Sequence, residues 1–181
     1  MPNSIRENNA DVRAFVITHP EVLEVLDVGP GEGTYHRLIG DLVDMDAVEI
    51  WEKNITDFSL KNKYREVFHS DIRDFPYPEA DGYDLVIFGD VLEHMPVVDA
   101  VKVFEDALSM SNWVLVSVPM VHFPQGAIDG NEHEFHEIED PQTELIPLLG
   151  KPLYWWRYQI TGTFIYQGKL EKRHENVSYD S

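Results

Sequence analysis

VLEVLDVGPGEG, residues 22–33, is the stretch that decides the fold. The apolar, β-branched run over residues 21–29 is typical of a buried strand. GPGEG at residues 29–33 then predicts a tight turn, and residues 34–41 predict a helix. Glycines in such a turn let the backbone bend sharply and approach a ligand at the positively polarised start of the helix. We therefore expect a strand, a ligand-binding turn and a helix, in that order.

The rest of the chain repeats this alternation of strand and helix. Further strands are predicted at residues 47–50, 65–69, 83–89 and 113–118, and helices at residues 52–64, 97–110 and 141–149. Residues 83–89 (YDLVIFG) and 114–116 are apolar runs typical of strands buried on both faces of a parallel sheet. Residues 153–167 predict two strands joined near residues 161–162, which indicates an antiparallel pair at one edge. The predicted fold class is α/β, with a doubly wound, mostly parallel sheet and helices on both faces.

The length of the chain, 181 residues, suits a single domain. Within it we expect a helical lead-in at residues 1–20 and a cofactor-binding half at residues 22–120. A loop at residues 119–140 would lie on the acceptor side. A closing helix and strands at residues 141–170 complete the domain.

The composition narrows the class of protein. Lys and Arg number 14 against 33 Asp and Glu, so the net charge is −19, which disfavours a nucleic-acid-binding surface and is compatible with a cationic ligand. There is no Cys, which excludes disulfide scaffolds and thiolate chemistry. No stretch of 18 apolar residues occurs, so no membrane segment is expected. We therefore predict a soluble, cytoplasmic protein.

An acidic residue, Glu49, ends the second predicted strand about 20 residues after Gly29, where a carboxylate can accept both hydroxyls of a ribose. Dinucleotide-binding turns have a third glycine where this chain has Thr34, with Gly33 one residue too early. That difference counts against NAD and FAD.

Four motifs together resemble the class I S-adenosylmethionine-dependent methyltransferases. They are VLDVGPGEG, VEIWE, SDIRDF and YDLVIFGDVLEHM, and the resemblance covers about residues 22–120. It implies a sheet of seven strands, of which the last is antiparallel, and S-adenosylmethionine as the cofactor.

The resemblance also implies roles for individual residues along the cofactor. The residues around its methionine portion would be Asp27, Gly29, Gly31, Gly33, Gly89 and Asp90. Glu49 would hold the ribose hydroxyls, and Trp51 would lie alongside the adenosine. Asp71 would accept from the adenine amino group, and Ile72 would pack on the ring.

Methyl transfer from a sulfonium is an in-line displacement, so the protein supplies positioning, desolvation and, for a protonated acceptor, a base. Side chains considered for that base are Asp90, Glu93, His94, His122, His133 and His136. We retain Asp90, His94, His133 and His136 as the predicted catalytic residues.

The loop at residues 119–140 is expected to be a mobile cover without secondary structure, with His133 or His136 facing the transferred methyl group. Gly126 and Gly130 would give it hinge freedom, and Phe123 and Phe135 would seal it. Its HEFH run, residues 133–136, has a spacing of three rather than the four of the HExxH zinc motif, so no metal is predicted.

Three functions stay open on the sequence. The leading one is methyl transfer to a small-molecule or glycan-type acceptor. The others are a non-catalytic protein that binds S-adenosylmethionine and an NAD-dependent oxidoreductase. Trp155 and Trp156 put a large side chain on each face of their strand, so a homodimer through that edge is a further alternative.

Overall fold

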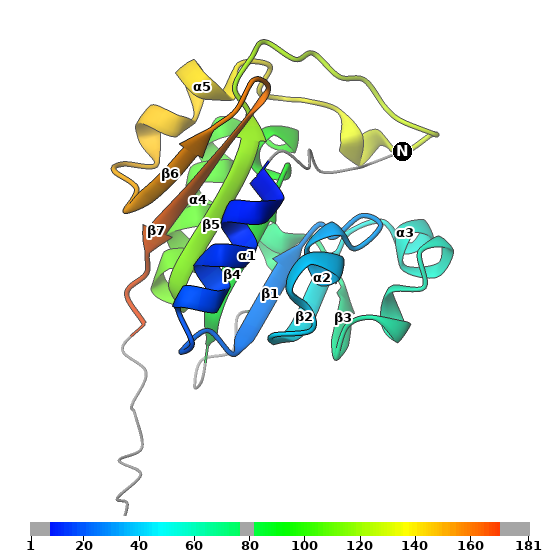
Figure 1. Ribbon diagram of the computed structural model, residues 1–181. Coiled ribbons are helices and arrows are strands. Elements are labelled where there is room, and N and C mark those ends of the chain that lie inside the picture. Colours follow the sequence, from blue (N-terminus) through cyan, green and yellow to red (C-terminus); the bar gives the residue numbers. More distant parts are fainter. Residues whose placement is uncertain (1–7, 77–81, 171–181) are drawn as a thin grey trace, which may run out of the picture.

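The computed structural model of the chain describes residues 8–76 and 82–170, and its centre is one twisted sheet (Figure 1). The strands are β1 (Glu24–Val28), β2 (Asp44–Glu49), β3 (Glu66–His69), β4 (Tyr83–Gly89), β5 (Ser111–Pro119), β6 (Tyr154–Arg157) and β7 (Thr161–Gln167). Their order across the sheet is β3-β2-β1-β4-β5-β7-β6. The order reverses between β1 and β4, and such a reversal is where open α/β sheets bind ligands.

The strand directions confirm the predicted fold class. β3, β2, β1, β4 and β5 pair in parallel, whereas β7 pairs antiparallel with both β5 and β6. β4 lies between β1 and β5, and all seven of its residues are buried. This central place explains the unbroken apolar run in its sequence.

Helices cover both faces of the sheet. On one face, Val25, Leu85 and Leu115 pack in a cluster with side chains from the first two helices. On the other face, Leu26, Val86 and Val116 pack against the long helix that follows β4. The helices are α1 (Asn9–Thr18), α2 (Thr34–Ile39), α3 (Glu52–Asp57), α4 (Val97–Ser109) and α5 (Pro141–Glu144). Figure 1 shows α1 in front of the sheet and α4 behind it.

Two predicted helices are shorter than expected. The helix expected over residues 52–64 ends at Asp57, because Ser59 adopts a left-handed backbone conformation (φ 52°) and a single 3₁₀ turn, η2 (Leu60–Asn62), follows. The helix expected over residues 141–149 divides into α5 and the 3₁₀ turn η6 (Ile146–Leu148), which contains Pro147. Proline lacks the amide that would continue the helical ladder.

The predicted position of the turn between the last two strands, near residues 161–162, is wrong. The turn lies at residues 158–160, where the Tyr158 amide donates to the Thr161 carbonyl, and Gly162 belongs to β7. A Cβ at Gly162 would stand 2.6 Å from Cγ of Met120. The glycine thus serves close packing in the sheet and not a turn.

Asp84 ties the start of β4 to the start of β1. Its carboxylate accepts hydrogen bonds from the backbone amides of Leu23 (3.0 Å) and Glu24 (2.9 Å), which are 61 and 60 residues away in the chain. The two central strands are thereby fixed in register on either side of the reversal.

In residues 8–76 and 82–170, no helix combines the length and apolar character that crossing a membrane requires. The cytoplasmic location stays a prediction.

Candidate active site

A cavity of about 360 Å³ opens at the carboxyl ends of β1, β2, β4 and β5. Its volume falls in the range of small-molecule sites. One part of the wall comes from the turn after β1 and from the ends of β2 and β3, and the other from the segment after β4 and from residues 119–136. It therefore joins the predicted cofactor-binding half to the predicted acceptor loop.

The glycine turn forms the floor of the cavity. Gly29, Gly31 and Gly33 have φ values of 61°, 52° and 84°, a region that side chains disfavour. A Cβ at Gly29 would also stand 2.8 Å from Cγ2 of Val91. Gly29 and Gly31 line the cavity, whereas Gly33 lies outside it and precedes the first residue of α2.

Asp27 lies beneath this turn and is not part of the cavity wall. It is almost wholly buried, and its Oδ2 accepts a hydrogen bond of 2.6 Å from the Tyr64 hydroxyl. Burial raises the pKa of Asp27 to about 7, although the Tyr64 hydrogen bond opposes the shift. Its position supports the turn from below.

Glu49 presents a buried carboxylate to the cavity. Its two oxygens accept from the Trp51 amide (2.9 Å) and the Asn54 side-chain amide (3.3 Å). Burial raises the pKa of Glu49, and these hydrogen bonds act against the shift. Trp51 does not line the cavity; the Lys53 ammonium lies 5.7 Å from the centroid of its ring.

Asp71 and Ile72 follow β3 and both line the cavity. The Asp71 carboxylate accepts from the Arg73 amide (2.9 Å) and forms an ion pair of 2.6 Å with the Arg73 guanidinium, which also reaches Asp99. The net pKa of Asp71 is lowered, because these Arg73 contacts outweigh the opposing effect of burial. The Nε of Arg73 also lies 3.0 Å from both oxygens, so Arg73 engages each oxygen of the Asp71 carboxylate.

Gly89 is the last residue of β4, Asp90 follows it, and both line the cavity. A Cβ at Gly89 would stand 2.1 Å from Cε2 of Tyr35, so only glycine fits there. Asp90 has a φ of 55°, and its amide donates to the Ser117 carbonyl at 2.9 Å. The strained conformation directs the chain away from the sheet at the point where the cofactor and acceptor sides meet.

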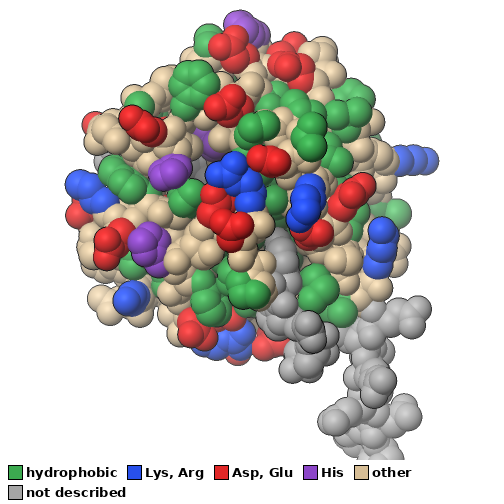
Figure 2. All heavy atoms as spheres, turned by 180° about the vertical axis from the view of Figure 1, so that it is seen from behind, with side chains coloured by type: hydrophobic (Ala, Val, Ile, Leu, Met, Phe, Trp, Pro, Cys, Tyr) green, Lys and Arg blue, Asp and Glu red, His purple; other side chains and the backbone are tan. Residues whose placement is uncertain are grey.

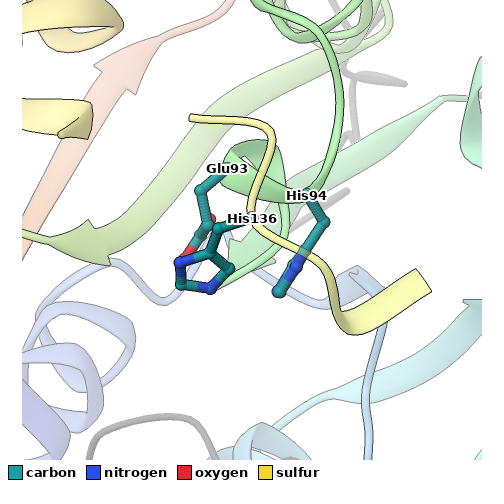
Figure 3. A group of neighbouring side chains, drawn as sticks. All are labelled: Glu93, His94 and His136. Atoms are coloured by element: carbon teal, nitrogen blue, oxygen red, sulfur yellow. The ribbon is translucent and has the colours of Figure 1, made fainter. Parts of the chain in front are cut away.

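Three titratable side chains gather on the acceptor side (Figure 3). Glu93 and His94 come from the 3₁₀ turn η4 (Leu92–His94), and His136 comes from the loop after β5. The His94 and His136 rings lie 4.7 Å apart, centroid to centroid. Burial and the neighbouring His136 lower the pKa of His94 to about 4, and burial lowers that of His136 as well.

Glu93 is fully buried. Neither of its carboxylate oxygens has a hydrogen-bond partner among residues 8–76 and 82–170. Burial raises its pKa well above the ordinary range, and the nearby Asp90 carboxylate adds to the shift. An unmet buried carboxylate in a cavity wall points to a function, since folding alone would select against it.

The loop at residues 119–140 has more structure than expected. It contains the 3₁₀ turn η5 (Glu132–Glu134), and Ile128 pairs with Asn131 in an isolated bridge. The Glu137 and Ile138 amides both donate to the Glu93 carbonyl at 3.0 Å. In Figure 1 the segment arches over the ends of the central strands. Its role as a mobile cover stays a prediction.

Individual loop residues separate into those that face the cavity and those that do not. His133, His136 and Phe123 line it, whereas Phe135 is exposed and stands outside the wall. His122 also lies outside, with its ring 3.7 Å from the Glu139 carboxylate.

The cavity thus collects most of the predicted site. Its lining includes Gly29, Gly31, Glu49, Asp71, Ile72, Gly89, Asp90, His94, His133 and His136, and excludes Asp27, Gly33 and Trp51. Asn54, Arg73 and Glu134 also line it and were not singled out from the sequence. Arg73 could have been predicted from the sequence, because a cation two residues after Asp71 is placed to pair with its carboxylate.

The family model described as a methyltransferase domain matches residues 3–169. A search of curated protein sequences gives no significant match.

Solved structures share the fold. The PH0226 protein from Pyrococcus horikoshii OT3 superposes with a TM-score of 0.65 and 17% identity, over 91% of this chain and 91% of that one. Magnesium protoporphyrin IX methyltransferase from Synechocystis PCC 6803, with bound SAM, gives 0.63 and 16% over 91% and 79%. The N-terminal domain of EvdMO1, with SAH bound, gives 0.64 and 14% over 91% and 82%. At these identities the similarity shows a common fold.

Proposed function

The chain belongs to the methyltransferase-domain family, and from that premise we propose that it transfers the methyl group of S-adenosylmethionine to a small-molecule or glycan-type acceptor. One observation carries the proposal. The glycine turn, the Glu49 carboxylate and Asp90 share a single cavity with the histidines of the acceptor side. The cavity lies at the reversal of strand order, where the two substrates of a transfer reaction can meet.

The cavity fits S-adenosylmethionine on its chemistry. Glu49 is held by two local hydrogen bonds with its carboxylate at the cavity, as a ribose diol requires. Asp71 and Ile72 offer an acceptor and an apolar surface for the adenine. Gly29 and Gly31 leave the turn bare, so the methionine portion can approach the backbone.

The bound sulfonium supplies an electrophilic methyl group, and the residues of the chain position the acceptor against it. Asp90 stands where the two halves of the cavity meet and would orient the reacting groups. The lowered pKa values of His94 and His136 keep both imidazoles neutral at pH 7. Either of these two rings can then accept a proton from the acceptor, and His133, which also lines the cavity, is a third candidate for the base.

The surface supports a small acceptor over a nucleic acid. On the face shown in Figure 2, Lys and Arg side chains lie among Asp and Glu side chains rather than in a patch of their own. With a net charge of −19, such a surface repels a phosphate backbone.

Two measurements test the proposal. Calorimetric titration should show binding of S-adenosylmethionine and none of NAD; the reverse result would assign an oxidoreductase. Release of S-adenosylhomocysteine should then depend on an added acceptor. Cofactor binding without turnover on any member of a broad acceptor panel would favour the non-catalytic alternative.

A homodimer through β6 is a second element of the proposal. Trp155 is 61% exposed on this strand, at the end of the sheet, and Tyr154 and Leu153 beside it are exposed as well. We expect the wild-type protein to sediment as a dimer. The Trp155→Ser variant should sediment as a monomer. A monomeric wild-type protein would remove the idea.

A further inference from the structure

We propose that Glu93, His94 and His136 bind a divalent transition-metal ion of the Zn²⁺ type, and that the ion holds and activates a hydroxyl oxygen of the methyl acceptor. One donor atom from each of the three side chains lies within 4.8 Å of the other two. The role of the ion in methyl transfer rests on the proposed function, whereas the metal site itself does not. The proposal departs from the sequence-based expectation of no metal.

The Glu93 carboxylate is the first reason. It is fully buried, and neither oxygen accepts a hydrogen bond within the described part of the chain. A buried carboxylate without partners is strongly destabilising, and coordination of a cation is a common way to satisfy it. Its backbone carbonyl is already held by the Glu137 and Ile138 amides, so the side chain sits on an anchored segment.

The histidine tautomers are the second reason. Nδ1 of His136 lies 2.6 Å from the Phe123 carbonyl, and Nδ1 of His94 lies 3.2 Å from the Phe135 carbonyl. A carbonyl oxygen only accepts, so both Nδ1 atoms must carry the proton. Each Nε2 then keeps a lone pair, and a backbone carbonyl behind the ring is the usual outer partner of a metal-binding histidine.

The donor set indicates the class of metal. Two imidazoles and one carboxylate are the ligands of catalytic zinc sites, which keep a fourth position open, and they also suit Co²⁺, Fe²⁺ and Mn²⁺. Mg²⁺ and Ca²⁺ prefer oxygen ligands throughout. Bonds of about 2.0–2.2 Å place ligand atoms closer together than here, so we expect the side chains to move inward by about 1 Å on binding.

The open position explains what the ion would do. Glu93, His94 and His136 line the same cavity as Gly89 and Asp90, so an oxygen on the ion would lie on the acceptor side of the cofactor. With the ion bound, the Nε2 lone pairs of His94 and His136 coordinate it, so these two rings no longer serve as the base. A hydroxyl bound to the ion ionises more readily, and its proton leaves to water. The oxyanion then donates a lone pair to the methyl carbon. The carbon–sulfur bond breaks as the new bond forms, and its electron pair stays on sulfur as a neutral thioether. The acceptor class is therefore an oxygen nucleophile.

Co²⁺ is the probe for the site, because its visible absorption reports bound nitrogen and oxygen ligands. Chelator-treated wild-type protein is titrated with Co²⁺ by absorption and with Zn²⁺ by calorimetry. We expect one equivalent to bind, and Glu93→Gln, His94→Gln and His136→Gln each to weaken Co²⁺ binding by at least about tenfold. His122→Gln is the matched control, since His122 belongs to the same loop and lies outside the cavity, and it should bind as the wild type does.

Circular dichroism and S-adenosylmethionine affinity establish that each variant is folded. The metal site is overturned if the wild type fails to bind stoichiometric Co²⁺ and Zn²⁺. It is also overturned if the three variants bind Co²⁺ as tightly as the wild type does. Catechol added to the Co²⁺-loaded protein should change its visible spectrum; an unchanged spectrum overturns the oxygen-acceptor part. If the protein binds metal but not S-adenosylmethionine, only the proposed function is contradicted. If it binds S-adenosylmethionine but no metal, only the metal site is contradicted.

Discussion

The two sides of the cavity satisfy their polar groups in opposite ways. On the cofactor side, Glu49 accepts hydrogen bonds from Trp51 and Asn54, and Asp71 accepts from Arg73, so these three bonds span at most five residues along the chain. On the acceptor side, His94 bonds to Phe135, 41 residues away, and the Glu93 carboxylate has no partner in the described residues. The comparison teaches that Glu49 and Asp71 on the cofactor side are held largely by neighbours along the chain, whereas the acceptor side is assembled from distant segments around the buried Glu93 carboxylate.

Glu49→Ala tests whether the cofactor side binds S-adenosylmethionine as proposed, and it should have the largest effect of all the variants. The substitution removes two charge-assisted hydrogen bonds to a ribose, so binding of S-adenosylmethionine should weaken by about 2–4 kcal/mol, measured by calorimetry. Glu52→Ala is the control, because Glu52 is exposed on α3 and should leave the affinity unchanged. Equal affinities in the two variants would show that Glu49 does not hold the ribose.

Asp27 is the exception on the cofactor side, since its Oδ1 has no partner in the described residues. Its pKa is raised to about 7. Between pH 5 and pH 8 the folded protein must therefore give up a proton that the unfolded chain has already lost. The protonated Asp27 carboxyl therefore stabilises the fold at low pH. This stabilisation is lost as the pH rises from the unfolded pKa to the folded pKa of about 7, so the free energy of unfolding should fall by about 2.5 kcal/mol between pH 5 and pH 8.

Urea unfolding of the wild type and of Asp27→Asn at pH 5 and pH 8 measures this difference. The fall in stability with pH should be smaller in the variant. Some fall should persist there, because the pKa of buried Glu93 is raised as well. Parallel pH dependences in the two proteins would contradict the assignment to Asp27.

His133→Gln and His136→Gln test the acceptor side during turnover. At least one of them should lose about tenfold in turnover, which is about 1.4 kcal/mol in the barrier, with the affinity for S-adenosylmethionine unchanged. The turnover rate is measured as release of S-adenosylhomocysteine in the presence of an acceptor that the wild type methylates. His122→Gln is the control and should turn over at the wild-type rate. If both variants turn over normally, the two histidines have no part in the chemistry, and the contrast between the two sides loses its functional meaning.

Gly126→Ala should have the smallest effect. No atom lies within 4 Å of a Cβ at Gly126, and its φ is not positive, so stability should change by less than about 1 kcal/mol. If the loop opens and closes about this residue, stiffening it should slow turnover by a few-fold. Turnover equal to that of the wild type would place the hinge elsewhere.

The sequence predicts best what depends on neighbours along the chain. The strand at residues 83–89 is confirmed to the residue, because burial on both faces leaves an unbroken apolar run. The glycine turn and the place of Glu49 at the end of β2 could be predicted for the same reason, since a turn and a strand end have local signatures. Seven of the ten predicted cofactor residues line the cavity.

The sequence predicts less well what depends on distant segments. The Glu93 carboxylate has no special context in DVLEHM, whereas the loop that bonds to its backbone carbonyl, and that carries His136, follows some 40 residues later. The sequence places His133 and His136 three residues apart in HEFH, whereas the fold brings His136 next to His94. Spacing within a loop carries little information when the partner comes from another strand end.

The link from Asp84 to the amides of Leu23 and Glu24 has a consequence for synthesis on the ribosome. β1, β2 and β3 emerge before β4, so an inner edge of the sheet stays without its partner until about 60 further residues have been translated. An apolar edge exposed in this way can pair with another nascent chain. We expect slow translation between residues 29 and 83 to promote aggregation. Rapid synthesis of β4 would let it pair with β1 and cover the exposed edge of the sheet.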